Sequence, residues 1–257
     1  MEPGVRLPRP EGLPVLTAVE VDSERERVYV GPDSVHLVEA VLRLAPRGER
    51  AVELGSGAGY LAVALSRRYR TVIATDVMPR AVEFTRVALA AGEVPSGHAT
   101  AVAVGDVAGG LRRNAFDLVA ANTPWVPQPD PSVAPVLFAD GGVTGAELPL
   151  RFIREGAALL RAGGVAITLA LDVTLRNGHR PLFEACGDLE ANAFATTLLP
   201  TPINHVFGRF RATMLGRQPE LVEAVHVAVV VARPFSNGEG RESLMIAARA
   251  LAHRWAA

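Results

Sequence analysis

Short apolar segments alternate along this chain with segments in which apolar residues recur every three or four positions. Short apolar runs bounded by Gly, Asp or Asn are typical of buried strands, and the helical spacing is typical of amphipathic helices. The expected strands lie at 51–54, 71–76, 99–104, 116–122, 165–171, 189–199 and 222–232. Because strands and helices alternate with short turns between them, the pattern predicts an α/β fold with a doubly wound, mostly parallel sheet and helices on both faces.

Capping residues and glycines indicate where the helices begin and end. Asp33 or Ser34 is expected to cap the first helix. The apolar side of that helix is formed by Val35, Val38, Val41 and Leu42. Further helices are expected at 60–70, 178–187 and 241–255. One more helix, which includes Gly156 to Arg161, is expected to end at the glycine pair of Ala162-Gly-Gly164.

Three alternating glycines follow the first expected strand directly, in Ala51-Val-Glu-Leu-Gly-Ser-Gly-Ala-Gly59. Glycine accepts a positive φ and lets a ligand approach the backbone without meeting a Cβ, and the next helix would direct its N-terminal amides at this loop. The spacing is G-x-G-x-G, whereas the dinucleotide fingerprint is G-x-G-x-x-G. Glu53 would also place a carboxylate where a pyrophosphate would have to sit. The segment therefore predicts a cofactor site that suits a cationic ligand.

Acidic residues end the next two expected strands. Asp76 lies about 20 residues after the glycines, where α/β nucleotide-binding folds place a carboxylate on the ribose hydroxyls. The third strand ends at Gly105-Asp106. The acids Glu53, Asp76 and Asp106 therefore occur in the order and phase expected of one cofactor cleft.

The E-L-G-S-G-A-G sequence resembles the first motif of class I S-adenosylmethionine-dependent methyltransferases, whose cofactor carries an ammonium and a sulfonium. This resemblance implies S-adenosyl-L-methionine as the cofactor and a Rossmann-like, seven-stranded sheet in the order 3-2-1-4-5-7-6 with an antiparallel seventh strand. It also implies that Asp106 accepts a hydrogen bond from the adenine amino group. The expected cofactor-binding residues are Glu53, Gly55, Ser56, Gly57, Gly59, Asp76, Val77, Asp106, Val107 and Asn122.

The fourth expected strand ends in Asn122-Thr-Pro-Trp125, which resembles the N-P-P-Y/F/W motif of methyltransferases that alkylate planar or amide nitrogens. In such a motif the asparagine carbonyl and the neighbouring main-chain carbonyl accept hydrogen bonds from an –NH₂ group, and the aromatic ring stacks on it. Positioning supplies most of what methyl transfer needs, because the sulfonium is already a strong electrophile. Asn122, Pro124 and Trp125 are the candidate catalytic residues. Thr123 replaces the first proline, which leaves the loop less rigid and adds a hydroxyl.

Two further segments extend the resemblance to the release-factor glutamine methyltransferases. Val28 to Glu39 is similar to their P-R-x-D-T-E-x-L-V-E segment, and Phe138 to Leu150 is similar to their D-G-G-x-x-G-L-D segment. The resemblance covers roughly residues 28 to 172 and omits the helical domain with which that family docks its protein substrate. We expect residues 1–45 to form an N-terminal extension and capping helix, and residues 46–257 to form the methyltransferase domain.

Composition fits one catalytic domain in the cytoplasm. The 257 residues are 49% hydrophobic, but no apolar run approaches the 18 or so residues of a membrane span. The start, Met1 to Pro10, lacks the apolar stretch of a signal peptide. The lone Cys186 excludes an internal disulfide and a cysteine-based zinc site.

Charge and histidine spacing indicate the partners. A formal net charge of −1 provides no global basic field for polyphosphate, so nucleic acid is not the expected substrate, and a small molecule, peptide or protein side chain is. The C-terminal helix is expected to pack on the domain or on a second copy rather than on a membrane, in a monomer or homodimer. No metal site is expected, because the histidines show no pairing at ligand spacing: His36, His98, His179, His205, His226 and His253.

Three functional interpretations follow from the residues. The first is an N-methyltransferase acting on an amide or amine nitrogen of a protein, peptide or peptide-like metabolite. The second is a small-molecule O- or C-methyltransferase in which Asn122 is only a turn residue, and in which His205, His36 or a lid formed by the Arg- and Phe-containing segment Asn204 to Arg217 supplies the general base. The third is a binding module without turnover, which the combination of Glu53, Asp76, Asp106 and Asn122 disfavours.

Overall fold

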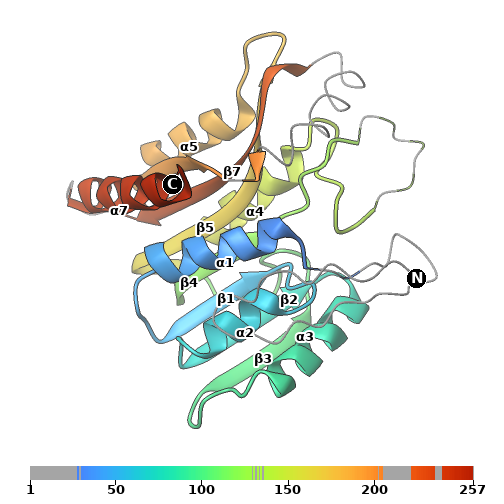
Figure 1. The fold of residues 1–257 in the computed structure, drawn as a ribbon, viewed down its shortest axis with the longest axis vertical. Coiled ribbons are helices and arrows are strands. Elements are labelled where there is room, and N and C mark those ends of the chain that lie inside the picture. Colours follow the sequence, from blue (N-terminus) through green and yellow to red (C-terminus); the bar gives the residue numbers. More distant parts are fainter. Residues whose placement is uncertain are drawn as a thin grey trace.

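The structure, a computed structural model, describes residues 28, 30–128, 130, 132, 134, 136–201, 203–204, 221–234 and 239–256. A seven-stranded sheet in the order β3-β2-β1-β4-β5-β7-β6 runs through it (Figure 1). The strands are β1 Arg50–Leu54, β2 Thr71–Asp76, β3 Ala99–Val104, β4 Phe116–Asn122, β5 Leu160–Leu175, β6 Phe194–Pro200 and β7 Leu221–Pro234. Only β7 runs antiparallel to its neighbours β5 and β6, whereas the pairs from β3 to β5 are parallel. The fold class and strand order predicted for the chain are confirmed.

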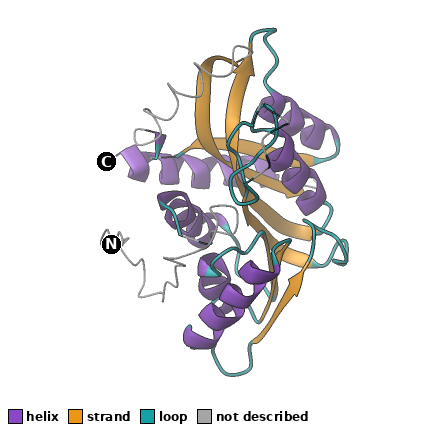
Figure 2. Ribbon diagram, turned by 90° about the vertical axis from the view of Figure 1, so that its right-hand side faces the viewer, coloured by secondary structure: helices purple, strands orange, loops and turns teal. Residues whose placement is uncertain are grey.

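Helices cover both faces of the sheet (Figure 2). The helices are α1 Pro32–Leu44, α2 Tyr60–Ser66, α3 Pro79–Ala91, α4 Glu147–Ala157, α5 Pro181–Ala191 and α7 Glu239–Ala256. One apolar core joins α1, α2, α3 and α7 to the sheet, and a second core joins α4 and α5 to its other face. The central strands β1 and β4 are buried on both faces, which is why they are continuous apolar runs. Within the described ranges no helix is both long and apolar enough to cross a membrane.

The expected cap of the first helix is wrong. Gly31 in an extended conformation precedes α1, Pro32 occupies the first turn, and no side chain caps the helix. Proline suits this position because its φ is already helical and its missing N–H would be unpaired there. Asp33 and Ser34 lie inside the first turn, and their side chains bond to Asn122 at the end of β4 instead.

The expected glycine cap at residues 162–164 is also wrong. Helix α4 ends at Ala157, and β5 begins at Leu160. The pairing of β4 with β5 shifts from Phe116–Leu160 to Leu118–Val165, so the glycine pair lies in a bulge within the sheet. A Cβ on Gly164 would lie 2.8 Å from the carbonyl oxygen of Phe116, so close backbone approach explains this glycine.

Other boundaries also differ from the prediction. The strand expected at 165–171 is β5, which extends from Leu160 to Leu175. The helix expected at 60–70 is α2, which ends at Ser66. The helix expected at 178–187 is α5, which begins three residues later, at Pro181. The strand expected from Leu189 starts at Phe194, because Leu189 is a buried residue of α5. Apolar periodicity over a short run does not distinguish the end of a buried helix from the start of a buried strand.

Candidate functional site

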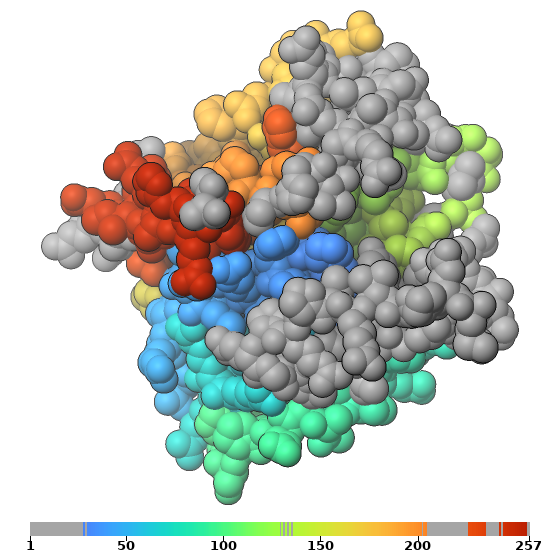
Figure 3. Space-filling view, in the orientation of Figure 1, coloured from blue at the N-terminus to red at the C-terminus, as the bar shows by residue number. Residues whose placement is uncertain are grey.

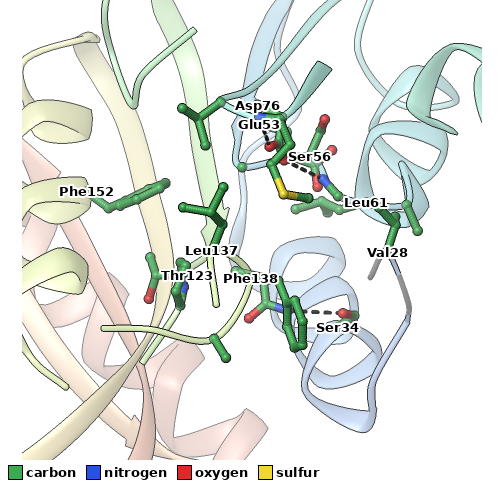
Figure 4. Close-up of a pocket in the computed structure, with 18 of the residues that line it drawn as sticks. Val28, Ser34, Glu53, Ser56, Leu61, Asp76, Thr123, Leu137, Phe138 and Phe152 are labelled. Carbon is green, nitrogen blue, oxygen red and sulfur yellow. Dashed lines mark hydrogen bonds between the residues drawn. The ribbon is translucent and has the colours of Figure 1, made fainter. Parts of the chain in front are cut away.

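A cavity of about 510 Å³ opens at the carboxyl ends of β1, β2 and β4 (Figure 4). Its walls come from regions far apart in the chain: the segment from Val28 to Leu37, the glycine loop after β1, the ends of β2 and β3, the loop that follows β4, the segment 137–139, and α4. Parallel strands of an open sheet end at the same edge, and this is where α/β folds bind ligands. The cavity therefore brings together the two ends of the predicted site, the cofactor loop and the Asn122 motif. The space-filling view shows α1, in blue, running across the middle of the described surface of the molecule (Figure 3).

The glycine loop is fixed by the neighbouring strand. The backbone N–H groups of Gly55 and Ser56 donate to the carbonyl oxygen of Thr75, at 2.8 and 2.9 Å. Gly57 has a φ of +50°, and a Cβ there would meet nothing within 4 Å, so it borders open space in the cavity. Gly59 has a different role, because a Cβ there would lie 2.8 Å from Cα of Thr85 in α3. Gly59 permits close helix packing and does not line the cavity.

Glu53 lies at the base of the cavity with only 3% of its surface exposed. Burial raises the pKa of this carboxyl well above its ordinary value, and the nearby charge of Asp76 raises it further. Its Oε2 atom is buried and accepts no hydrogen bond from the described residues. An unpaired buried carboxylate is costly unless a cation or donor approaches it. The residue fits the cationic ligand that the sequence predicts.

Asp76 is held by two backbone amides. Its Oδ2 accepts from the N–H of Gly57 and its Oδ1 accepts from the N–H of Met78, each at 2.9 Å. Burial raises the pKa of the carboxyl, and these backbone hydrogen bonds oppose that shift. Because each carboxylate oxygen can accept more than one hydrogen bond, both oxygens can still accept from a pair of hydroxyls in the cavity.

Asp106, Val77 and Val107 border the outer part of the cavity. Arg151 of α4 grips the Asp106 carboxylate with two hydrogen bonds, at 2.9 and 2.8 Å, and also bonds to Glu155 at 2.7 Å. Glu155 in turn accepts a hydrogen bond from the backbone N–H of Ala108, so side chains of α4 hold the loop that follows β3. Sequence reasoning missed Arg151, although its spacing of four from Glu155 on one helix is a recognisable ion-pair pattern.

Asn122 is the polar centre of the second half of the cavity. Its side-chain Nδ2 donates to Asp33 Oδ2 and to Ser34 Oγ, both at 3.0 Å, and Figure 4 shows the bond to Ser34 as a dashed line. Its Oδ1 is buried and accepts no hydrogen bond from the described part of the chain. An unpaired buried acceptor of this kind costs about 1–3 kcal/mol. The site therefore presents an acceptor atom that a bound donor would satisfy.

Thr123 compensates for the proline that the motif lacks. Its hydroxyl is buried and donates to the carbonyl oxygen of Leu169 in β5 at 2.6 Å. The hydrogen bond holds the backbone after β4 against the next strand, which a proline would do by restricting φ. This hydrogen bond is a tether that the sequence did not reveal. The hydroxyl is also committed to β5 rather than to the cavity.

The glycine-rich segment after residue 138 clamps the loop that carries Trp125. Val126 donates its N–H to the carbonyl oxygen of Ala139, and Gly141 donates to the carbonyl oxygen of Val126, at 2.7 and 2.9 Å. A Cβ on Gly141 would lie 2.7 Å from Cα of Trp125, so the two backbones touch. Leu137 and Phe138 of this segment also line the cavity (Figure 4). Together with Pro124, Trp125 and Val126 they make this end of the cavity largely apolar.

The histidines contribute nothing to the described lining of the cavity. His36 contacts Trp255 of α7 edge to face, with ring centroids 6.1 Å apart, and is not among the lining residues. The expectation that His36 reaches the cleft is therefore wrong. His205 and the rest of the expected lid, residues 205–217, lie outside the described residues; Asn204 bonds to backbone groups of Thr201 and Val227. The residues that the structure describes contain no cluster of His, Cys, Asp and Glu suited to a metal ion.

The cavity carries acidic groups without basic ones. Asp33, Glu53, Asp76 and Asp106 line it, and none of its described lining residues is Lys, Arg or His. Such a lining repels phosphate groups and attracts positive charge.

Comparison with known proteins relates the chain to methyltransferases. The family model "Methyltransferase small domain" matches residues 32–172, more than half of the 257 residues. A release factor glutamine methyltransferase of Koribacter versatilis is 30% identical over 99 residues, which are 37% of this chain and 34% of that protein. The chain thus matches about a third of the length of this relative.

Solved structures share the fold at low identity. A geranyl diphosphate methyltransferase in complex with GPP and sinefungin is 14% identical with a TM-score of 0.54, covering 79% of this chain and 78% of that one. The cyclase SpnF, a 4+2 cyclase, is 15% identical with a TM-score of 0.51, covering 79% and 82%. One of these proteins is named as a methyltransferase and the other as a cyclase. Similarity at this level therefore shows only the fold, and the reaction depends on the residues of the site.

Proposed function

The chain belongs to the methyltransferase small-domain family and is an S-adenosylmethionine-dependent methyltransferase, and we propose that it methylates an amide or amine nitrogen of a protein, peptide or peptide-like metabolite. The observation that carries this proposal is the Asn122 amide, with both N–H groups engaged and a buried Oδ1 that accepts nothing from the described chain. A nitrogen nucleophile that carries an N–H would supply the missing donor.

The residues around the glycine loop fit the cofactor. S-adenosylmethionine supplies an electrophilic methyl group on a sulfonium, together with an ammonium and a ribose. Glu53 offers a buried carboxylate oxygen, Oε2, that accepts no hydrogen bond from the described residues, and Asp76 offers two oxygens to the ribose hydroxyls. Gly57 keeps one wall of the cavity free of a side chain. We assign Gly55, Ser56, Val77, Asp106 and Val107 to contacts with the rest of the cofactor, because they line the same cavity.

Asn122, Pro124 and Trp125 would hold the methyl acceptor. The Asn122 oxygen accepts the acceptor N–H and so directs the nitrogen lone pair at the methyl group, while Trp125 offers a flat apolar surface to a planar group. Fixing two reactants in line in this way converts a bimolecular step into an effectively unimolecular one. The apolar surroundings exclude water, which strengthens the hydrogen bond to Oδ1.

The charge of the cavity supports a neutral or cationic acceptor over a nucleic acid. Four acidic residues and no described Lys, Arg or His line it, although Arg151 from outside the lining pairs with Asp106, and the formal net charge of the chain is −1. A polyphosphate chain would be repelled at the position where its base would have to enter.

The alternative is an O- or C-methyltransferase. Such an enzyme often uses a general base within hydrogen-bond reach of the acceptor. Among the described lining residues the side-chain carboxylate nearest the acceptor end is Asp33, which is already bonded to Asn122. This arrangement favours nitrogen.

A labelled-methyl screen tests the proposed substrate class. The protein is incubated with methyl-tritiated S-adenosylmethionine and a cell lysate, which is then separated into protein, nucleic-acid and small-metabolite fractions. We expect label in the protein fraction or in amine- and amide-containing metabolites, stable to mild base as N-methyl groups are. Label confined to nucleic acid, or released by mild base as from a methyl ester, would contradict the proposal.

A further inference from the structure

The first turn of α1 reaches the centre of the site. Asp33 and Ser34 lie 89 and 88 residues before Asn122, and each accepts a 3.0 Å hydrogen bond from its Nδ2. An amide nitrogen has two N–H groups, so these two contacts use both of them. The bond to Asp33 is charge-assisted and is the stronger of the two kinds of contact.

These contacts permit only one orientation of the Asn122 amide. If the amide turned by 180°, its oxygen would face the Asp33 carboxylate, and two acceptors would meet without a proton between them. The nitrogen therefore faces α1, and Oδ1 faces away from it. The orientation is set by hydrogen-bond chemistry, independently of the cofactor and the acceptor.

Asp33 and Ser34 accept hydrogen bonds from Asn122 instead of capping their own helix. Asp and Ser at the start of a helix usually accept from its first free N–H groups, yet α1 has no side-chain cap. Asp33 in the first turn also suits the positive end of the helix dipole, so its negative charge is stable there.

Helix α1 is held in place by hydrogen bonds at three residues, Leu42, Ala45 and Glu39. Arg68 donates to the carbonyl oxygens of Leu42 and Ala45 at its carboxyl end. Glu39 in its middle accepts from the indole N–H of Trp255 at 3.0 Å. Side chains that orient a catalytic group work best when their own backbone is held in this way.

We propose that Asp33 and Ser34 are positioning residues that lock the side-chain amide of Asn122 with Oδ1 turned toward the methyl acceptor. This proposal rests on the proposed function, in which Asn122 Oδ1 accepts a hydrogen bond from the N–H of the methyl acceptor. In this proposal Asp33 and Ser34, which also line the cavity, act on the acceptor through Asn122.

The orientation can be tested without any substrate. In a ¹H–¹⁵N spectrum the Asn122 side-chain NH₂ pair is identified by its loss in Asn122→Ala. We expect both its protons to be shifted from the usual side-chain amide position and slow to exchange with solvent in the wild type. In Asp33→Ala they should move toward that position and exchange at least 10-fold faster. Unchanged shifts and exchange would overturn the lock.

A double-mutant cycle tests the effect on turnover. The readout is the initial rate of labelling of the lysate fraction that the wild type labels most, with methyl-tritiated S-adenosylmethionine. Asp33→Ala should slow labelling 10- to 100-fold in the wild-type background and less than 3-fold in the Asn122→Ala background, because residues that act through one group are not additive. S-adenosylhomocysteine affinity should change less than 3-fold. An equal loss in both backgrounds would overturn the proposal.

Conservative variants control for folding. Asp33→Asn keeps an oxygen that can accept from Nδ2 of Asn122, so its labelling rate should be within 10-fold of wild type. Ser34→Ala should lower the labelling rate, and Ser34→Thr, which keeps the hydroxyl, should restore it. If Asp33→Ala unfolds, the comparison of Ser34→Ala with Ser34→Thr replaces it; no difference between these two would count against the lock. A fully active Asn122→Ala enzyme would refute the proposed function, whereas an inactive Asn122→Ala with a fully active Asp33→Ala would refute this inference alone.

Discussion

At the scale of single residues, the site is defined by buried polar atoms that lack partners. Glu53 Oε2 and Asn122 Oδ1 both line the cavity, and neither accepts a hydrogen bond from the described chain. Folded proteins rarely leave such atoms unpaired, and the exceptions are concentrated at sites that bind something. In the proposed function the two atoms mark the two ends of the reaction: Glu53 Oε2 would face the positive charge of the cofactor, and Asn122 Oδ1 would accept the N–H of the acceptor.

Asp76→Ala should remove most of the stabilisation that S-adenosylhomocysteine gives. A ligand that binds only the native state stabilises it by about 2.7 kcal/mol at 100 times its dissociation constant. Asp76 lines the cavity, so its loss should remove the proposed contact with the ribose. Differential scanning calorimetry with and without the ligand measures the effect. The control is Asp188→Ala, at an exposed position of α5, which should keep the full shift. An Asp76→Ala shift equal to that of the wild type would remove Asp76 from the site.

The raised pKa of Glu53 predicts how stability changes with pH. In the unfolded chain this carboxyl loses its proton near the ordinary value of 4.5, whereas the folded protein holds it to a higher pH. The folded state therefore binds more protons above pH 4.5, and the free energy of unfolding falls as pH rises from 4.5 through the raised pKa. In Glu53→Gln this fall should be smaller. Urea unfolding of the unliganded protein at several pH values measures it, with the exposed Glu83→Gln as control. A fall of the same size in Glu53→Gln would show that the buried carboxyl does not titrate in this way.

At the scale of helices and strands, sequence pattern predicted the central elements and failed at their ends. Strands β2, β3 and β4 have the predicted bounds, because each is a short apolar run that ends in a glycine, an acid or an asparagine. The roles of Asp33, Ser34 and Thr123 could not be predicted, since their hydrogen bonds join segments 46 to 89 residues apart. A Ser or Asp before an apolar helix looks like a cap in sequence, and only the tertiary fold shows that a strand end competes for it.

Gly141→Ala should lower turnover without loss of cofactor affinity. The added methyl group would lie 2.7 Å from Cα of Trp125 and 2.6 Å from the carbonyl oxygen of Gly145, both backbone atoms that must shift. A displacement of about 1 Å at the acceptor can cost about 100-fold in rate. Methyl-labelling rate and S-adenosylhomocysteine titration are the measurements. Gly187→Ala is the matched control, because a Cβ there meets nothing within 4 Å and alanine favours a helix by about 0.5–1 kcal/mol. Normal turnover in Gly141→Ala would show that the clamp does not position Trp125.

At the scale of the whole molecule, the last helix supports the helix that carries Asp33. The indole of Trp255 donates to Glu39 of α1 and contacts His36 edge to face, although 216 residues separate Trp255 from Glu39. Although burial alone would raise the pKa of Glu39, its hydrogen bonds and the nearby arginines hold that pKa below its ordinary value. Helix α7 therefore contacts α1 from the far end of the described chain, and both helices pack on one apolar core.

Trp255→Ala should destabilise the protein and also slow methyl transfer. The half-buried indole packs against the core that contains α1, so we expect a loss of about 2 kcal/mol in the free energy of unfolding, less than for a fully buried tryptophan. Trp255→Phe, which keeps the ring but not the N–H, should lose about 1 kcal/mol. Chemical denaturation and labelling rate measure the two effects. Wild-type stability in Trp255→Ala would show that α7 does not brace α1.

The most direct test of the proposed chemistry is the rate of methyl transfer by Asn122→Ala, measured beside its affinity for S-adenosylhomocysteine by calorimetry. We predict that affinity stays within a few-fold of wild type while the rate falls by about 10² or more, the loss seen when one positioned polar group is removed from a transition state. Asn192→Ala, at an exposed asparagine after α5, should leave both unchanged. An Asn122→Ala enzyme that transfers methyl groups at the wild-type rate would contradict the assignment of Oδ1 to the acceptor, and with it the N-methyltransferase proposal.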